Sequence, residues 1–286
     1  MIRRREDFPP TRELPWLDRP DALEEIERRR RAGRITADQA NWLAHFSREG
    51  YVVFENVLER SDIDAVNADV DRIVASSRHL PFPELQKKFE NTFVHSAAIR
   101  RVFTNAGMLA RLDLLFDRPA LPYQTLNMPV SSQQAAHSDE ILMTSHPPGY
   151  MAAVWFALED ITPDCGPLRL WPRSHRLPYI GARDVGIPRG VGEEECARVY
   201  NARYYEMIGE QIQRLGLQEW TFLPKCGDAL IWHSNLLHGA HFVTRAEATR
   251  KSMIGHYYAD GVVHYSDLFQ RPCDLPGLRS TSPATR

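Results

Sequence analysis

Hydrophobic residues in the N-terminal part of the chain recur at intervals of three and four, the period of an amphipathic helix. Thr36 and Gln39 have the spacing of a capping box ahead of one such stretch, and Gly50 can end it. Ser61 and Asp64 repeat the capping pattern ahead of a second stretch. The pattern therefore predicts helices over 36–50, 61–74 and 99–116.

Three other segments of this part have different patterns. Residues 1–20 are rich in proline and have no hydrophobic period, which predicts an irregular arm on the surface or on a partner subunit. The charged run 24–31 is typical of a solvated helix face. The apolar residues 51–54 predict a short strand.

After Leu121 the pattern changes to short β-like runs separated by Pro and Gly. Their even spacing favours an antiparallel sandwich or jelly roll. The predicted strands cover 121–130, 150–158, 167–172, 219–223, 228–233, 237–243 and 250–258.

The long segment 178–218 interrupts these strands, and its second half, 193–215, has the apolar spacing of a helix. An insertion of this length is a candidate lid. We expect a mainly β protein with flanking helices that forms a single domain over 1–286. It consists of an arm and helical support (1–118), a jelly-roll core (119–262) with the lid-like insertion, and a C-terminal tail (263–286).

Composition excludes several classes of function. The net charge of −2 offers no basic surface, so we expect no nucleic-acid partner. The basic start is followed by Phe8-Pro9-Pro10 rather than by the apolar run of a secretory signal, and no segment is long enough to span a membrane. The four cysteines are far apart and form no CxxC pair, which is typical of reduced thiols. We expect a cytoplasmic protein whose oligomeric state the sequence leaves open.

The triplet His137-Ser138-Asp139 places an imidazole and a carboxylate on one side of an extended segment. A mononuclear iron site needs three such ligands on one face, with the opposite face left for cosubstrate and dioxygen. With 11 histidines and 37 acidic residues, His-x-Asp/Glu is expected about 1.4 times by chance. Taken alone, the triplet could equally be a turn pair that closes a hairpin.

A second group of residues downstream completes the pattern. The buried-type run 228–233 is followed by His238 and Gly239, and glycine there allows close approach of a backbone. Arg250 follows, on the same strand face as Ser252. A guanidinium fork with a neighbouring hydroxyl suits the outer carboxylate of a dicarboxylate cosubstrate.

Each of these residues has a simpler interpretation. His233, His241 and His256 compete with His238 for the third ligand position, and a histidine in such a run is usually a core or surface residue. Arg250 could form a surface ion pair, for example with Glu247. Trp155 by default belongs to the core.

As an ordered set, the motifs from 36 to 258 resemble the phytanoyl-CoA dioxygenase family. The motifs that carry the resemblance are His137-Ser138-Asp139, Gly166-Pro167-Leu168, Pro172-Arg173-Ser174-His175, Gly227-Asp228, Leu237-His238-Gly239 and Thr249-Arg250-Lys251-Ser252. The family often has Asn-Gly-Pro-Leu and Pro-Gly-Ser-His where this chain has Cys165-Gly166-Pro167-Leu168 and Pro172-Arg173-Ser174-His175. Both departures lie outside the metal set.

The resemblance implies a double-stranded β-helix, a cupin-like jelly roll, with Fe(II) as metal, 2-oxoglutarate as cosubstrate and dioxygen as oxidant. The residues that match the family's metal ligands are His137, Asp139 and His238. Those that match its cosubstrate-binding positions are Arg250, Ser252, Trp155 and, more weakly, Asn127.

The expected activity is hydroxylation of an unactivated C–H bond of a small molecule. The sequence does not identify that substrate. We expect its pocket to use Ile141, Leu142, Met143, His146 and the 178–218 insertion. Two alternatives stay open: a catalytically silent jelly roll that binds a ligand or partner, and a cupin-type hydrolase or isomerase that uses zinc or manganese.

Overall fold

The computed structural model describes residues 3–77 and 88–279, so residues 1–2 of the expected arm and 280–286 of the expected tail lie outside it. In the described chain before residue 120 there are five α-helices: α1 (Ala22–Arg31), α2 (Ala37–Glu49), α3 (Arg60–Ser77), α4 (Ala97–Phe103) and α5 (Ala106–Phe116). Short 3-10 helices cover Arg5–Asp7, Thr92–Val94 and Ser174–Arg176. None of the helices in the described ranges is long and apolar enough to cross a membrane.

The capping box of α2 forms as predicted. The backbone N–H of Gln39 donates to the Thr36 hydroxyl, and the Gln39 side chain accepts from the Thr36 backbone N–H. Gly50 ends the helix with a φ of 82°, a left-handed conformation that suits glycine. Residue 51 then enters strand β1 directly.

Two predictions about the helices were wrong in detail. The single helix expected over 99–116 is broken between α4 and α5, because Asn105 caps α5 by accepting the Met108 backbone N–H. Helix α3 begins at Arg60, so Ser61 lies inside it rather than at its cap.

The main sheet has six strands in the order β1-β8-β5-β10-β3-β2, with antiparallel neighbours. Every strand expected from the sequence forms, with ends that differ by a few residues. In chain order the strands of this sheet are β1 (Tyr51–Phe54), β2 (Phe89–Glu90), β3 (Ala120–Met128), β5 (Met151–Ala157), β8 (Ala229–His233) and β10 (Ser252–Ala259).

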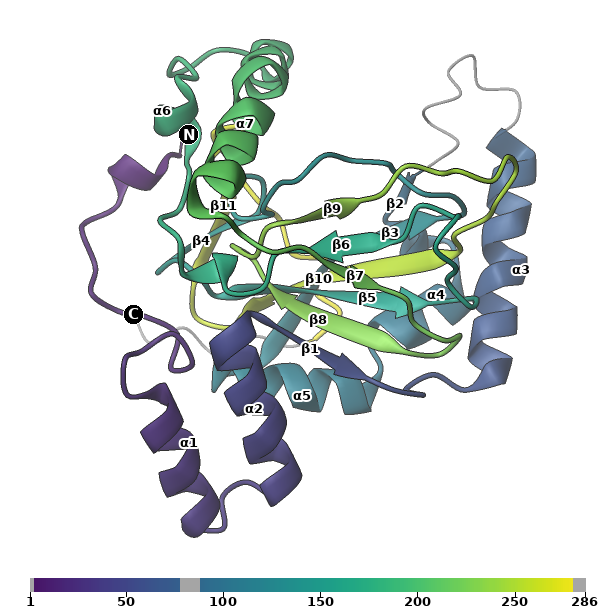
Figure 1. The fold of residues 1–286 in the computed structure, drawn as a ribbon, viewed down its shortest axis with the longest axis horizontal. Coiled ribbons are helices and arrows are strands. Elements are labelled where there is room, and N and C mark those ends of the chain that lie inside the picture. Colours follow the sequence, from purple (N-terminus) through teal and green to yellow (C-terminus); the bar gives the residue numbers. More distant parts are fainter. Residues whose placement is uncertain (1–2, 78–87, 280–286) are drawn as a thin grey trace.

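The sheet is buried on both faces. On β5, Val154 and Phe156 pack against the N-terminal helices, whereas Ala153 and Trp155 face a second core. That core is closed by a smaller sheet of β7 (Trp220–Phe222), β6 (Leu168–Leu170) and β9 (His238–Ala240). Figure 1 shows α4 and α5 behind the main sheet and β6, β7 and β9 in front of it. The mainly β core with flanking helices is therefore confirmed.

A third sheet contains strands that the sequence did not predict. It joins β4 (Thr144–His146) to β11 (Val263–Ser266) and β12 (Arg271–Pro272). The segment assigned to the C-terminal tail thus begins with two paired strands. These strands are short, and one of the two partners of β11, strand β4, lies far away in the sequence, so no local pattern marks them.

The insertion 178–218 contains α6 (Ala182–Val185) and α7 (Glu193–Leu215). The observed range of α7 is the predicted one. Gly216 ends it with a φ of 59°. The apolar face of α7 packs with Ile141, Trp171 and Leu237, so the helix covers the segment that follows the His137 triplet.

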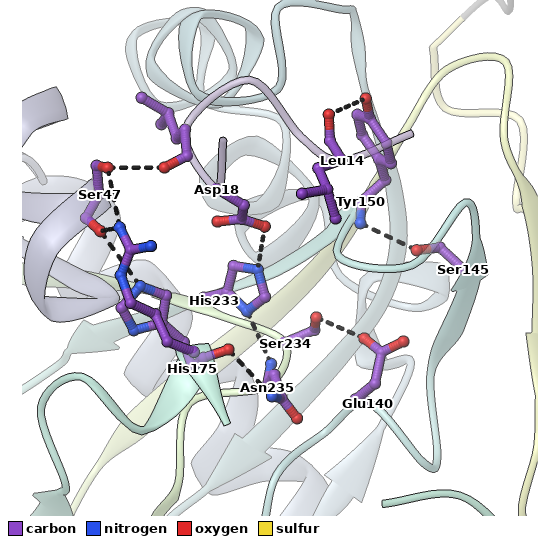
Figure 2. A network of polar contacts seen from close by, with 12 residues as sticks. Leu14, Asp18, Ser47, Glu140, Ser145, Tyr150, His175, His233, Ser234 and Asn235 are labelled. Atoms are coloured by element: carbon purple, nitrogen blue, oxygen red, sulfur yellow. Dashed lines mark hydrogen bonds and ion pairs between the residues drawn. The ribbon is translucent and has the colours of Figure 1, made fainter. Parts of the chain in front are cut away.

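The N-terminal arm is held against the body of the protein by a buried ion pair. The Asp18 carboxylate lies 3.1 Å from His233 Nε2, and His233 Nδ1 accepts the Asn235 backbone N–H. Figure 2 shows Asp18 and His233 at the centre of a polar network that reaches Ser47 and His175. The attraction to Asp18 raises the pKa of His233 against the effect of burial, and His233 lowers the pKa of Asp18.

We predict that Asp18→Asn destabilises the protein by about 3 kcal/mol at about pH 6, where both groups of the pair are charged. The raised pKa of His233 gives a stabilisation that is complete below its unfolded value of 6.5 and is lost as the pH rises through the folded pKa. The loss should therefore be smaller at about pH 8.5. Urea unfolding at both pH values measures it.

Asp21→Asn is the matched control, because Asp21 is exposed and its side chain makes no capping bond. It should change the free energy of unfolding little at either pH. An equal loss from Asp18→Asn at both pH values would show that His233 is neutral in the folded protein.

Candidate functional site

A cavity of about 230 Å³ opens between the main sheet and the smaller sheet of β6, β7 and β9. Among the residues that line it are three, from two separate segments, whose ligand atoms lie within 4.8 Å of one another: His137, Asp139 and His238. In the described ranges no other group of three His, Cys, Asp or Glu side chains is placed so closely.

Backbone pairing brings these residues together. The His137 backbone N–H donates to the His238 carbonyl at 2.8 Å, and the His238 N–H donates to the His137 carbonyl at 2.9 Å. The Asp139 N–H donates to the Ser234 carbonyl at 2.9 Å. His137 and His238 thus form an isolated antiparallel bridge, and Asp139 is bonded to the connection between β8 and β9.

The two imidazoles have a defined tautomer. His137 Nδ1 lies 2.8 Å from the Ala135 carbonyl, and His238 Nδ1 lies 2.9 Å from the Leu236 carbonyl. A carbonyl only accepts, so both Nδ1 atoms carry the proton and both Nε2 atoms keep a lone pair. Such a backbone partner is the usual support of a metal-binding histidine.

Burial keeps both rings neutral. It lowers the pKa of His137 to about 3, with a further contribution from His238, and it lowers the pKa of His238 to about 4. Neutral imidazoles are the form that binds a metal ion. His238 Nε2 lies 3.6 Å from Asp139 Oδ1, so a carboxylate oxygen lies beside the unprotonated ring nitrogen of His238.

Trp232 on β8 positions the carboxylate and was missed by the sequence interpretation. Its indole Nε1 donates to Asp139 Oδ2 at 2.8 Å, and its ring packs 4.8 Å from the His238 ring. This bond fixes one carboxylate oxygen and leaves Oδ1 toward the histidines. The two residues are far apart in the sequence, so no spacing rule could have paired them.

Arg250 lies just before β10 and lines the same cavity. Its side chain is 1% exposed, yet it contacts no carboxylate of the described residues. Nη1 donates to the Gly166 carbonyl at 3.2 Å, Nη2 lies 3.6 Å from Met128 Sδ, and Nε has no partner in the described ranges. Burial lowers the pKa of Arg250 to about 10, as expected for a cation without a counter-ion.

Two of the other predicted cosubstrate residues lie on the cavity side of the sheet. Trp155 on β5 lines the cavity, and its indole Nε1 has no partner among the described residues. Ser252 on β10 is opposite Met128 of β3, a cavity-lining residue. Its buried hydroxyl also lacks a partner within the described ranges.

The structure does not bring Asn127 into the cavity. Asn127 is paired with Met253, which belongs to the core on the helix side of the sheet. Its side-chain oxygen accepts a hydrogen bond from the Thr92 hydroxyl at 2.5 Å. Successive residues of a strand point to opposite faces of the sheet. Leu126 and Met128 therefore face the cavity, and Asn127 faces away from it.

The competing histidines lie outside the cluster. His233 is held by Asp18, and His241 is a partly exposed residue that contacts Glu219 and Thr221. His256 on β10 lines the cavity but is not among the three closely placed ligand residues. The geometry therefore selects His238 as the third member.

A polar network behind the triplet holds it in place. The Ser234 carbonyl accepts the backbone N–H groups of Asp139 and Glu140, and the Ser234 hydroxyl donates to Glu140 Oε2 at 2.6 Å. Figure 2 shows Ser234 and Glu140 beside the Asp18–His233 pair. Burial raises the pKa of Glu140 to about 7.

The cavity wall agrees only partly with the expected pocket. Leu142 and Met143 line it, whereas Ile141 is buried against α7, and neither Ile141 nor His146 lines it. No residue of 178–218 lines it either. Instead α7 supports the triplet from outside, because the Tyr204 hydroxyl accepts the Ser138 backbone N–H at 3.0 Å.

Comparison with known proteins places this geometry in a family. The family model described as phytanoyl-CoA dioxygenase matches residues 46–251. The ectoine dioxygenase of Nocardia farcinica (strain IFM 10152) is 26% identical in an alignment of 230 residues, which covers 73% of this chain and 73% of that protein.

Solved structures show the same fold at lower identity. The apo form of EctD from S. alaskensis has a TM-score of 0.63 at 20% identity, with 86% of each chain covered. The α-ketoglutarate-dependent carbocyclase SnoK from nogalamycin biosynthesis has a TM-score of 0.63 at 14% identity, covering 85% of this chain and 94% of its own. The motifs, the fold and the family match agree: the chain belongs to the phytanoyl-CoA dioxygenase family.

Proposed function

We propose that the protein is an Fe(II)- and 2-oxoglutarate-dependent dioxygenase that hydroxylates an unactivated C–H bond of a small molecule. Membership of the family and the similarity to an ectoine dioxygenase support the class of enzyme. Structures of related fold include EctD with 2-oxoglutarate and 5-hydroxyectoine, and SnoN with Fe3+ and α-ketoglutarate. We further propose that the facing sheets form a double-stranded β-helix.

One observation carries the proposal: two complementary sets of uncompensated groups share one buried cavity. His137, His238 and Asp139 present lone pairs that no cationic side chain of the described residues binds, and Arg250 presents a buried positive charge with no carboxylate partner in the described ranges. Burying such groups unpaired costs free energy. Their presence in one cavity therefore indicates two bound ligands, a cation at the lone pairs and an anion at Arg250. A divalent metal ion and a dicarboxylate satisfy both sets.

The donor set fits Fe(II). Two neutral imidazoles and one carboxylate are the facial arrangement that non-haem iron oxygenases use. We assign His137 Nε2, His238 Nε2 and Asp139 Oδ1 as ligands, because their other polar atoms are already bonded. When bound, the iron with 2-oxoglutarate and dioxygen supplies the oxidation of a C–H bond, with succinate and carbon dioxide as co-products.

The protein's own residues bind and orient. Arg250 would hold the outer carboxylate of 2-oxoglutarate, with the unpartnered hydroxyl of Ser252 and the indole N–H of Trp155 as further donors in this part of the cavity. Trp232 keeps the Asp139 carboxylate turned toward the histidines. Because the Asp139 carboxylate would occupy this coordination site, a halide cannot easily bind there. This favours hydroxylation over halogenation.

We predict that succinate forms from 2-oxoglutarate when the purified protein is supplied with Fe(II), ascorbate and air. Asp139→Ala and His238→Ala should each lower that rate by more than about 100-fold, because loss of partners outside the ligand set alone costs about 10–100-fold. Quantitative mass spectrometry of succinate provides the measurement. His241→Ala is the matched control and should keep the wild-type rate, since His241 lies outside the cavity. Wild-type turnover in Asp139→Ala would contradict the assignment.

We predict that Arg250→Ala weakens 2-oxoglutarate binding by about 2–5 kcal/mol, because it removes a buried charge-assisted contact. Arg250→Lys should recover only part of the loss, since an ammonium group cannot form the planar fork. Anaerobic calorimetric titration of the Fe(II) protein measures both affinities. Arg245→Ala is the control: this exposed arginine in the same loop pairs with Asp164. An unchanged affinity in Arg250→Ala would mean that another residue binds the carboxylate.

A further inference from the structure

The cavity contains a buried imidazole that neither the metal set nor the cosubstrate set uses. His256 on β10 is 2% exposed and lines the cavity. Neither ring nitrogen makes a hydrogen bond to any residue of 3–77 or 88–279, and Nδ1 is fully buried. Leaving a buried polar group unpaired costs free energy, so such a group in a cavity indicates a bound partner.

His256 lies at the end of the cavity away from Arg250. Arg250, Ile254 and His256 all line the cavity, and six residues of extended chain separate the first from the last by roughly 20 Å at Cα. Asp139, His238 and His137 contribute to the pKa of His256 but not to that of Arg250. His256 is therefore nearer than Arg250 to this cluster.

A second unpartnered side chain stands beside His256. Gln124 of β3 is its direct neighbour across the sheet and also lines the cavity. The Gln124 amide makes no hydrogen bond within the described residues. The lining of the same cavity also includes the apolar side chains of Leu142, Met143 and Phe269.

The other charged residues that line the cavity, apart from Asp139 and Arg250, already have partners. Lys88 Nζ lies 3.5 Å from Glu90 Oε1, and Arg271 Nε lies 2.8 Å from Glu193 Oε1. Apart from Asp139 and Arg250, the described lining residues thus offer no unpaired full charge. What they offer is a neutral imidazole and a neutral amide against an apolar wall.

We propose that His256, together with Gln124, forms the subsite that orients the substrate by hydrogen bonds to a neutral polar group, a hydroxyl or a carboxamide. The substrate is then a small amphipathic molecule, with its apolar part against Leu142, Met143 and Phe269 and its polar group held by β3 and β10. This inference rests on the proposed oxygenase function and adds the chemical class of its substrate.

The donor and acceptor inventory supports a neutral group. An uncharged imidazole has one donor and one acceptor, and an amide has two donors and one acceptor. This set matches a hydroxyl or carboxamide, which also donates and accepts. An isolated carboxylate or ammonium group would be buried here without an opposite charge, at a large cost in desolvation.

The test uses three probes that share a cyclohexane ring and differ in the attached group: cyclohexanecarboxamide, cyclohexanecarboxylate and cyclohexylmethylammonium. Each is titrated anaerobically into the Fe(II)·2-oxoglutarate protein, and binding is followed by ligand-observed NMR. We expect the wild-type protein to bind the carboxamide at least about tenfold more tightly than either charged probe.

Variants connect this preference to the side chain. His256→Phe should weaken carboxamide binding by about tenfold, whereas His256→Gln, which keeps a donor and an acceptor, should retain most of it. His241→Phe is the matched control with wild-type binding, because His241 lies outside the cavity. A merely structural role for His256 would weaken all three probes equally.

The 2-oxoglutarate affinity of the same samples separates the possible failures. Failure of the wild-type protein to bind 2-oxoglutarate would contradict the proposed function itself. Normal 2-oxoglutarate binding without a preference for the carboxamide, without binding of any probe, or with full carboxamide binding in His256→Phe would overturn the subsite alone.

Discussion

The backbones of His137 and His238 exchange two hydrogen bonds, and the site depends on this exchange. It joins two segments that are about a hundred residues apart in the chain and turns both imidazoles into the same cavity. Each ring is then fixed a second time, because its Nδ1 proton is used by a carbonyl two residues earlier. Trp232 completes the arrangement by bonding one oxygen of Asp139.

The cavity shows a balance between stability and function. Arg250, Trp155, Ser252 and His256 all place buried polar atoms where the described protein supplies no partner. A core selected only for stability would not keep so many unsatisfied groups in one place. Their presence in or beside the cavity of the His–Asp–His set is the physical reason to propose that the cavity binds ligands.

Much of the fold could be predicted from the sequence because its signals are local. The capping box at Thr36 and the apolar spacing of 193–215 gave accurate helix positions, and Pro and Gly separate the strands. The break at Asn105 could not be predicted, because the sequence around it continues an apolar run and only packing shows that Asn105 acts as a cap. The strands β4, β11 and β12 could not be predicted either, because such short strands are stabilised by their partners in the sheet and have no local pattern.

The site was predicted in part for the same reason. The His–Asp–His cluster and Arg250 were found from motif order, but the face of Asn127 depends on strand register, which the sequence does not display. Trp232 could not be connected to Asp139, because the bond spans two segments that only the fold brings together. His256 was weighed only as a rival ligand. Its position on the cavity face, opposite Gln124, gives it a different role.

The most direct test of the central claim is an anaerobic titration of the metal-free protein with Fe(II), followed by 2-oxoglutarate, with metal content and visible absorption measured together. The account predicts one iron per chain and a new charge-transfer band when the 2-oxo acid chelates the iron, with both lost in His137→Ala. Iron binding that is absent in the wild-type protein, or unchanged in His137→Ala, would contradict it.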